Sequence, residues 1–390
     1  RSANPLFFSH YQQHIPHPDL GYYLLDSPDT LRQQAELMKK SCVYGQVFYH
    51  YWFSGKLILE KPAQMLLKHP DINMPFCFCW ANENWTKRWD GNEQDVLLAQ
   101  NYSPEDARAF IRYLIPFFND KRYLRVENRP VLFIYRPASI TEPAEYIRAW
   151  AEECHSSGLK PPLIVAVLTR GATDPRDFGM DAGVERPLHD WTNGNVTDIR
   201  ATLHAYEPLK GSVLAYPQVA QYYMEENEPK EFTWFRSILP MWDNTARYGA
   251  EAYMLHGSSP ELFQTWLEQA IAFSRVQLAP DRRLILINAW NEWAEGAHIE
   301  PDSRHGYAYL NSIGRALSGI SPSDDINPNK KLPAGLHVRL SFSETILISL
   351  RADASLRQRF ARCLSASTLF AQCKVSLDTE EFNNELKDHE

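Results

Sequence analysis

Residues 284–296 contain the side-chain types that chemistry on a sugar requires. The apolar run Leu284–Ile287 is typical of a buried strand, and two carboxyl residues, Glu292 and Glu295, follow it three positions apart. Hydrolysis of a glycosidic bond uses one carboxyl group as proton donor and a second as base or nucleophile. Indole rings offer an apolar face to a pyranose, and the same segment holds Trp290, Asn291 and Trp293. We predict that the two glutamates are a catalytic pair; the structural alternative is a turn with solvated acids.

Three further segments, 48–53, 75–91 and 240–247, repeat this mixture of aromatic and hydrogen-bonding side chains. Together with 284–296 they hold seven of the 11 tryptophans of the chain, which favours one shared site over scattered core positions. The substrate-binding residues predicted from these segments, and from the acids that follow the last one, are Tyr49, His50, Trp52, Trp80, Asn82, Glu83, Trp85, Trp242, Asp243, Trp290, Asn291, Trp293 and Glu300.

Structural roles stay open for several of these side chains. Glu83 can form a salt bridge with Lys87 or Arg88. Asp243 can pair with Arg247 instead of orienting a hydroxyl group. The lone histidine of segment 48–53 has even odds of being structural.

Strand-like and helix-like patterns alternate along the chain, which predicts a parallel sheet with crossover helices. Helical patterns cover residues 30–40, 145–153 and 262–273, and Ser-Pro-Glu sequences at Ser103 and Ser259 are typical helix starts. Candidate strands lie near 45–49, 75–80, 131–135, 163–168, 181–185, 238–241 and 284–289.

Polar or aromatic residues follow the carboxyl end of each candidate strand. They include Arg136 and Glu185, which we add to the predicted substrate-binding residues. In an eight-stranded α/β barrel the active site lies at that end of the strands. The predicted fold is therefore α/β, a (β/α)8 TIM-type barrel.

The count of seven strands is one short of eight. Residues 1–28 contain no good first strand, so we expect either that the first strand lies upstream of Arg1 and is missing from this chain, or that residues near Leu6–Phe8 serve poorly in that role. We predict a barrel domain over 1–319, a linker over 320–333 with three prolines, and a C-terminal appendage over 334–390. Within the appendage, 336–350 alternates like strands, and 355–365 and 380–388 have helical patterns.

The composition restricts the kinds of partner and cofactor that we expect. The formal net charge is −8 and the pI about 5.9, without a basic stripe, so nucleic acid is not expected. An apolar run of about 18 residues, long enough to span a membrane, is absent. The six cysteines form no Cys-x-x-Cys pair and favour reduced thiols and the cytoplasm, although the start at Arg1 leaves export open. No metal cluster is evident, so we expect no metal and no cofactor; the oligomeric state is left open.

Several motifs, in the same order, resemble the WbsX family. They are Tyr49–Lys56, Leu59–Pro62, Trp80–Trp85, Trp242–Arg247, Asn288–Gly296 and Glu300–Asp302, and the similarity covers about residues 10–312. Members of that family are labelled glycosyltransferases of polysaccharide (O-antigen) synthesis and are described as glycoside hydrolase family 99-like. The first strand in that family carries Tyr, Pro, Gln, Phe and His. In this chain, Gln12–Pro16 matches that pattern only in part.

The resemblance implies a mechanism for the glutamate pair. Family 99 hydrolases are (β/α)8 barrels that cut α-mannosides internally with retention, and their Asn-Glu-Trp-x-Glu-Gly motif aligns with Asn291–Gly296. By that similarity Glu292 would take the proton of the substrate 2-hydroxyl, which then attacks its own anomeric carbon. Glu295 would act as general acid and then as general base.

Three functions stay open at this point. The first is a retaining endo-glycosidase-like enzyme that acts on a polysaccharide. The second is a glycosyltransferase of surface-polysaccharide synthesis, although the chain has neither an Asp-x-Asp motif nor a glycine-rich phosphate loop. The third is a non-catalytic glycan-binding module, for which a like-charged pair of carboxylates offers little advantage.

Overall fold

The main sheet of the protein is built from seven parallel strands in sequence order. The computed structural model describes residues 4–87, 92–187 and 196–319, and the backbone of three short strands between 337 and 376. The parallel strands are β1 (Gln46–Phe53), β3 (Phe76–Trp80), β7 (Arg129–Ile134), β8 (Leu163–Leu168), β9 (Ala182–Glu185), β11 (Thr233–Ile238) and β13 (Ile285–Ile287). Two short strands, β2 (Lys56–Ile58) and β6 (Arg125–Val126), add antiparallel to β1 and β7.

Six of the seven predicted strands are confirmed, and the one placed at 238–241 is wrong. The observed strand β11 ends at Ile238, where the prediction begins. Pro240 explains the difference, because proline has no backbone N–H to donate to a central ladder. The buried residues Leu239 and Met241 therefore belong to the loop after the strand.

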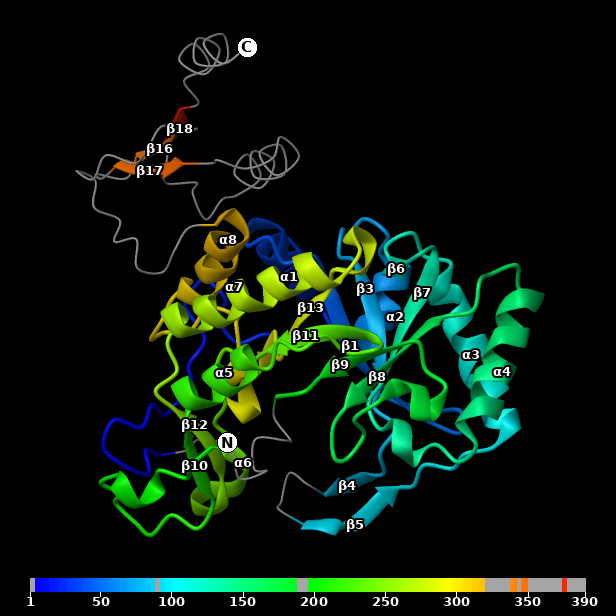
Figure 1. Cartoon of the computed structure of the whole chain (residues 1–390), viewed down its shortest axis with the longest axis horizontal. Helices are drawn as coiled ribbons and strands as arrows, with labels where there is room; N and C mark the ends of the chain where they lie inside the picture. The colour runs from blue at the N-terminus through cyan, green and yellow to red at the C-terminus, as the bar shows by residue number, and fades with distance from the viewer. Residues whose placement is uncertain are drawn as a thin grey trace.

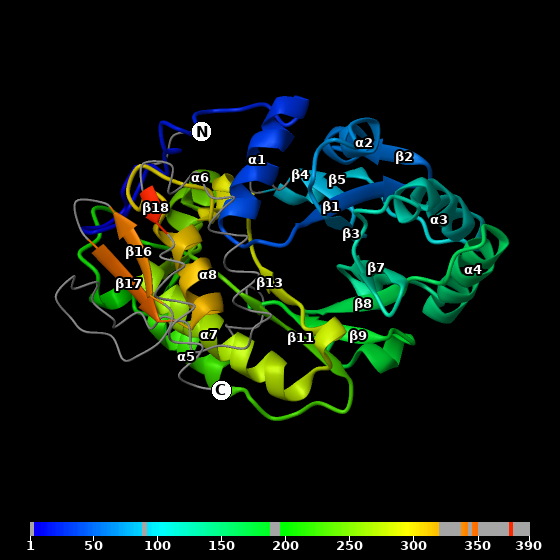
Figure 2. The same cartoon turned by 90° about the horizontal axis from the view of Figure 1, so that it is seen from above.

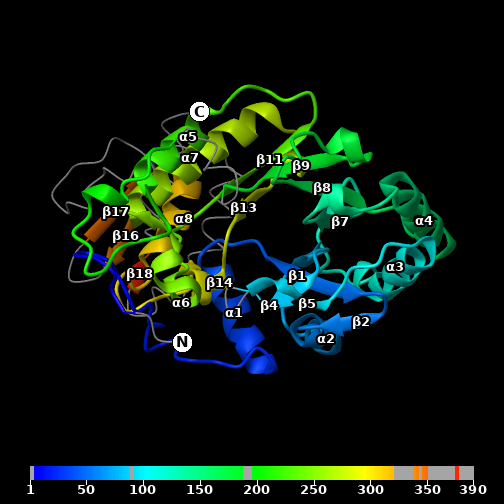
Figure 3. The same cartoon turned by 90° about the horizontal axis from the view of Figure 1, so that it is seen from below.

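Helices cover the outside of the curled sheet, as Figure 1 and Figure 3 show. The helices are α1 (Pro28–Lys40), α2 (Lys61–Lys68), α3 (Pro104–Phe118), α4 (Pro143–Ser156), α5 (Tyr216–Glu225), α6 (Thr245–Tyr248), α7 (Pro260–Gln277) and α8 (Ala308–Ser318). The two predicted helix starts are confirmed: the hydroxyls of Ser103 and Ser259 accept hydrogen bonds from the backbone N–H groups of Asp106 and Leu262.

The core lies between the sheet and these helices. Trp80 of β3 is fully buried against Phe110 of α3 and Trp150 of α4, with ring centroids 4.7 and 6.1 Å away. Cys77 and Cys79 of the same strand are buried free thiols, as expected. Aromatic residues therefore occur both in this core and at the candidate site, and the sequence pattern does not tell which of them lie in which place.

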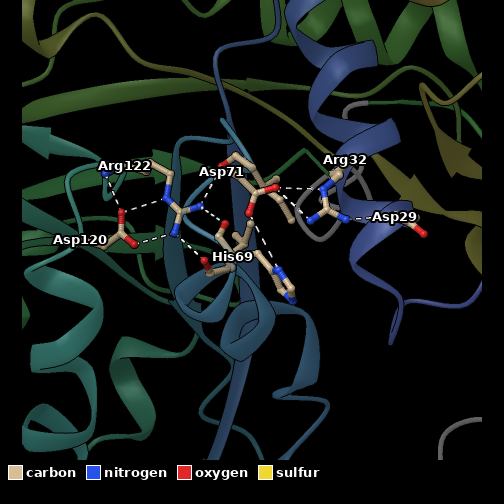
Figure 4. Close-up of polar contacts among 8 residues, drawn as sticks. Asp29, Arg32, His69, Asp71, Asp120 and Arg122 are labelled. Carbon is tan, nitrogen blue, oxygen red and sulfur yellow. Dashed lines mark hydrogen bonds and ion pairs between the residues drawn. The ribbon is translucent and has the colours of Figure 1, made fainter.

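The sheet is not closed among the described residues: its pairings end at β13 on one side and at β2, beside β1, on the other. Helix α1 lies between these two sides (Figure 2). Its Gln34 donates to Glu300, which follows β13. Its Arg32 donates to Asp71, which follows α2 (Figure 4). The described part of the chain thus shows the predicted parallel α/β architecture as an open, curled sheet, and the closed eight-stranded barrel is not confirmed.

The loop after α2 is held by a buried arginine. Arg122 pairs with Asp120 and donates to three backbone carbonyls, those of Leu66, His69 and Ile72 (Figure 4). A guanidinium group has five N–H donors in a rigid fork, so it can satisfy several carbonyls at once. The start of β3 is positioned in this way.

A second, smaller cluster of apolar residues was not predicted. Two parallel strands, β10 (Ser212–Ala215) and β12 (Tyr253–His256), pair with one another outside the main sheet. Phe7, near the N-terminus, packs on Val213 and Met254 of these strands. The N-terminal segment is therefore anchored close to the loop that follows β11.

In the predicted appendage, the alternating segment 336–350 contains two strands, as expected. Strand β16 (His337–Ser341) pairs antiparallel with β17 (Thr345–Ser349) and with β18 (Lys374–Ser376). The linker over 320–333 and the helical patterns at 355–365 and 380–388 lie outside the described residues. Among the helices that the structure describes, none is long and apolar enough to cross a membrane.

Candidate active site

The two predicted catalytic glutamates lie on one tight hairpin at the carboxyl end of β13. Strand β14 (Asn291–Glu292) pairs antiparallel with β15 (Ala297–His298), and the 3-10 turn Trp293–Glu295 joins them. We call residues 291–298 the carboxylate hairpin. Gly296 closes it with φ +56°, and a Cβ there would lie 2.8 Å from the Asp243 carbonyl oxygen. Glycine is the residue that combines this backbone conformation with such a close approach.

One arginine bridges both carboxylates. Arg247 of α6 donates from Nη2 to Glu292 Oε1 at 3.0 Å and from Nη1 to Glu295 Oε1 at 2.5 Å. Burial raises the pKa of Glu292, while the charges of Arg247 and Arg186 oppose that rise. Arg247 therefore favours the ionised form of Glu292, against the effect of burial.

Arg186, directly after β9, is a second cation at the site and was missed by the sequence reasoning. Its Nη1 donates to the Tyr49 hydroxyl at 2.5 Å and lies 3.4 Å from Asn288 Oδ1. Its guanidinium carbon lies 4.9 Å from the centre of the Tyr135 ring, a cation–π contact. The alternation of side chains along a strand could have indicated Arg186, because neighbouring residues such as Glu185 and Arg186 face opposite sides of the sheet.

Glu185, the neighbour that we did predict, faces the other side of the sheet. It is 6% exposed and accepts a hydrogen bond from Arg236 Nε at 2.7 Å and another from the Ser237 backbone N–H. Arg236 also donates to the backbone carbonyl of Glu226, beyond α5. The expectation that Glu185 faces the barrel mouth is therefore corrected: it belongs to a buried ion pair between the sheet and the helices.

Aromatic side chains form one wall beside the carboxylates. Tyr49 and Tyr135 meet edge to face at 5.6 Å, and Tyr51 meets Trp85 in the same way at 4.9 Å. Burial raises the pKa of Tyr51, and the charge of Glu292 raises it further, which places this hydroxyl near the pair. Tyr51 was not predicted, although it shares a strand face with Tyr49.

A cavity of about 450 Å³ opens beyond the carboxyl ends of β3 and β7. Glu83 and Arg136, both predicted as substrate-binding, line it and form a salt bridge at 2.5 Å. The partner of Glu83 in this bridge is thus an arginine of the next strand end. Glu292 and Glu295 do not line this cavity, which is therefore a neighbouring space rather than the space between the carboxylates.

Four predicted substrate-binding residues are buried rather than on an open surface, and one of them, Asn82, also lines this cavity. Asn82 is fully buried and joins the ends of β3 and β7: its side chain donates to the Arg136 carbonyl and accepts from the Arg136 N–H. The others are Trp52, whose Nε1 donates to Asp106, His50, which stacks on Tyr113, and Trp80. Burial lowers the pKa of His50 to about 4, so this imidazole is neutral near pH 7.

Asp243, after β11, ties the N-terminal segment to the site rather than pairing with Arg247. Its carboxylate accepts from His10 Nε2 at 2.7 Å and Gln12 Nε2 at 2.6 Å, and it lies 3.7 Å from His14 Nε2. Burial opposes ionisation, but the hydrogen bond from His10 and the nearby His14 hold the pKa of Asp243 well below its usual range. Trp242, beside it, is buried.

Glu300 is a buried acceptor for four donors. It receives hydrogen bonds from Tyr23 at 2.6 Å, Gln34 at 2.9 Å, Trp290 Nε1 at 2.8 Å and Trp293 Nε1 at 2.9 Å. The Tyr23 hydroxyl in turn accepts a hydrogen bond from Asn291. The predicted residues Trp290, Asn291, Trp293 and Glu300 are therefore brought together, with a carboxylate that orients both indoles.

One group of side chains among the described residues has the geometry to hold a metal ion. His14, His298 and Asp302 each offer one ligand atom, and these atoms lie within 4.8 Å of one another. Sequence reasoning missed this group, because His14 is far from the other two along the chain.

Comparisons with known proteins agree with these motifs. The family model described as Glycosyltransferase WbsX matches residues 1–313. The curated protein WxcX of Xanthomonas campestris pv. campestris (strain ATCC 33913) is 37% identical over 314 residues, which are 80% of this chain and 45% of WxcX. WxcX of strain B100 matches to the same extent. The chain thus spans about half the length of the curated relatives it matches.

Of two similar solved structures, the one with the higher TM-score shows the same type of fold. A glycoside hydrolase-like protein superposes with a TM-score of 0.55 at 14% identity, covering 81% of this chain and 94% of that protein. A GH99 endo-alpha-mannosidase from Bacteroides thetaiotaomicron gives a TM-score of 0.48 at 16% identity, covering 81% and 90%. From the family match over residues 1–313 and the WxcX relatives, the chain belongs to the glycosyltransferase WbsX family, a family of carbohydrate-active enzymes.

Proposed function

We propose that the protein is an enzyme that breaks glycosidic bonds within a polysaccharide, with retention, through Glu292 and Glu295. The observation that carries this proposal is the pair of partly buried carboxylates on one hairpin, bridged by Arg247 and faced by an aromatic wall. Retaining enzymes need two carboxyl groups close together, whereas inverting enzymes leave room between them for a water molecule. Two carboxylates that share one guanidinium are close neighbours.

In this mechanism Glu292 is the base and Glu295 the acid. Burial raises the pKa of Glu292, which makes it a stronger proton acceptor once it is ionised. It would take the proton of the substrate 2-hydroxyl as that oxygen attacks the anomeric carbon. Glu295 would give a proton to the departing oxygen as the glycosidic bond breaks, and would later take one from the water that attacks the anomeric carbon. In that second step the bond between the 2-oxygen and the anomeric carbon would break, and Glu292 would return its proton to the 2-oxygen.

The neighbouring side chains would bind and orient the sugar. Tyr51 and Trp85 present ring faces and edges on one side of the pair. Arg186, fixed by Tyr49, would donate to a hydroxyl or a carboxylate of the glycan. Glu83 and Arg136 line the neighbouring cavity, where a further sugar of a chain can lie. An extended site of this type suits an endo-acting enzyme; the identity of the sugar stays open.

The test is the release of reducing ends from a panel of mannans and bacterial surface polysaccharides. The chain would be compared with Glu292→Gln and Glu295→Gln, and with Glu231→Gln, which removes an exposed partner of Arg176, as matched control. We expect release by the unaltered chain and the control, and a loss of at least about 100-fold in either active-site variant. Release that survives both substitutions would refute the assignment of the pair.

Transfer is the second candidate, favoured by the family's description as a glycosyltransferase. The same two carboxyl groups can pass a glycosyl unit to a sugar hydroxyl instead of to water. Incubation with a labelled oligosaccharide acceptor separates the two reactions: transfer lengthens the acceptor, and hydrolysis does not. Glycan binding without either product, and unaffected by the two Gln variants, would leave a non-catalytic binding module.

A further inference from the structure

We propose that His14, His298 and Asp302 form a site for a divalent transition-metal ion of the zinc class, which fastens the N-terminal segment to the carboxylate hairpin. The three side chains come from the N-terminal segment, from β15 and from the loop after β15. All three are buried, with side chains 6%, 1% and 2% exposed. Two imidazoles and one carboxylate are a ligand set that suits zinc and its neighbours.

The distances fit an ion after small movements. His14 Nδ1 lies 3.0 Å from His298 Nε2, and His298 Nε2 lies 3.9 Å from Asp302 Oδ2. Zinc–nitrogen bonds of about 2.0–2.1 Å place two tetrahedral ligands roughly 3.3 Å apart. The two imidazoles would therefore separate by a few tenths of an ångström, and Asp302 Oδ2 would approach His298 Nε2 by roughly 0.6 Å. Three protein ligands leave a fourth position for water.

The atoms of these side chains that would face away from the ion lie beside carbonyl or carboxylate oxygens or accept from backbone N–H groups. His298 Nδ1 lies 3.2 Å from the Glu300 carbonyl oxygen, and His14 Nε2 lies 3.7 Å from Asp243 Oδ2. Asp302 Oδ1 accepts from the backbone N–H groups of Arg304 and His305. Metal-binding histidines almost always donate their other N–H to a carbonyl or a carboxylate, and ligating carboxylates are themselves hydrogen-bonded.

Hydrogen bonds among these side chains do not satisfy all of their buried polar atoms. If His298 Nδ1 donates to the Glu300 carbonyl, its Nε2 is an acceptor, so His14 Nδ1 must donate to it. The Nε2 of a neutral His14 would then be an acceptor that faces the Asp243 carboxylate. A doubly protonated His14 would remove that conflict, but buried Asp302 Oδ2 would still have no hydrogen-bond partner among the described residues. A cation at the centre satisfies all three side chains.

The site would hold the back of the carboxylate hairpin rather than touch the substrate. His298 pairs with Asn291 across the hairpin, and its ring stacks on Trp293 at 3.8 Å. The N-terminal segment already approaches the loop through His17 N to the Pro301 carbonyl and Ser303 N to the Ile15 carbonyl. An ion would lock this contact. The inference does not depend on the proposed function, because metal binding is measured without turnover.

The test is metal binding by the whole chain. After purification its metal content would be measured, and after chelation Zn²⁺ and Co²⁺ would be titrated. We expect about one ion per chain and the visible absorption of four-coordinate Co²⁺. His14→Gln and Asp302→Asn should weaken Zn²⁺ binding by more than about 10-fold, since even the loss of an outer-shell partner weakens binding by about 10–100-fold. His17→Gln, in the same segment and partly exposed, is the matched control.

Thermal unfolding of the unaltered chain gives a second readout. Zn²⁺ should raise its Tm after chelation, and should leave the Tm of His14→Gln unchanged. If Asp302→Asn does not fold, His14→Gln and this Tm shift still decide the matter. The inference is overturned if the chelated chain shows no saturable binding of Zn²⁺ or Co²⁺, or if His14→Gln binds as tightly as His17→Gln.

Discussion

Removal of Arg247 should move the pH dependence of the carboxylate pair upward. Arg247→Met keeps much of the aliphatic stem and removes the guanidinium, which lies 3.0 Å from Glu292 and 2.5 Å from Glu295. A hydrogen bond to a charged group contributes about 1.5–3 kcal/mol. The side chains of Arg247, Glu292 and Glu295 are 30%, 40% and 22% exposed, so solvent screening favours the lower end of that range.

About 1.4 kcal/mol corresponds to roughly one pKa unit. The guanidinium favours the ionised form of Glu292, so its loss should raise the pKa of Glu292. A base must be ionised to act. The acidic limb of the profile of kcat/KM against pH should therefore shift upward by about one unit in Arg247→Met, and by less in Arg247→Lys, which keeps a charge.

The assay is reducing-end release between pH 4 and 9, with a titration of the labelled glutamate carboxyls by NMR as a readout that needs no turnover. Arg176→Met, which removes an exposed arginine paired with Asp174 and Glu231, is the control. An acidic limb and carboxyl titrations that stay in place in Arg247→Met would show that the bridge does not set the protonation of the pair, and the reasoning would fail.

Three further predictions concern stability around the site. Glu300→Gln should lower the free energy of unfolding by about 2–4 kcal/mol, because an amide cannot accept from all four donors that Glu300 serves; a loss under about 0.5 kcal/mol in urea unfolding would contradict this. Gly296→Ala should be destabilised by about 1–3 kcal/mol, and by more than Gly179→Ala, which has a similar φ but only a side-chain contact at 3.6 Å; equal losses would rule out the close approach to Asp243 as the cause. Burial raises the pKa of Glu185 to about 7, so its contribution to stability is present below its ordinary pKa and is lost as the pH rises through about 7. The difference in unfolding free energy between the unaltered chain and Glu185→Gln should thus shrink from pH 5 to pH 8, whereas a difference that grows would mean that the ion pair with Arg236 dominates.

Local sequence patterns were enough to predict most of the elements. Six strands and the capped helices after Ser103 and Ser259 follow from short apolar runs and from helix-start chemistry within a few residues. The pair of glutamates was likewise visible, because Glu292 and Glu295 are close in the sequence, but the hairpin that carries them was not predicted. The strand placed at 238–241 failed because apolar residues continue past a strand end that Pro240 imposes.

The roles of individual side chains depended on contacts between distant segments. Glu185 and Arg186 are equally polar neighbours, yet one pairs with Arg236 under the helices and the other reaches Tyr49. Trp80 is fully buried in the core while Trp85 meets Tyr51 beside the carboxylates, although both follow from the same aromatic motif. Composition cannot separate these cases, because indole rings suit a core and a sugar site equally well.

By itself, then, the sequence determined the parallel α/β architecture, the family motifs and the spacing of the two glutamates, since these are properties of short segments. Only the tertiary structure decided that the described sheet is open with α1 across its ends, that Arg247 bridges the pair, and that His14 meets His298 and Asp302. The physical reason is that charge pairing and metal-type geometry need atoms within a few ångströms, and folding brings these together from residues far apart in the chain.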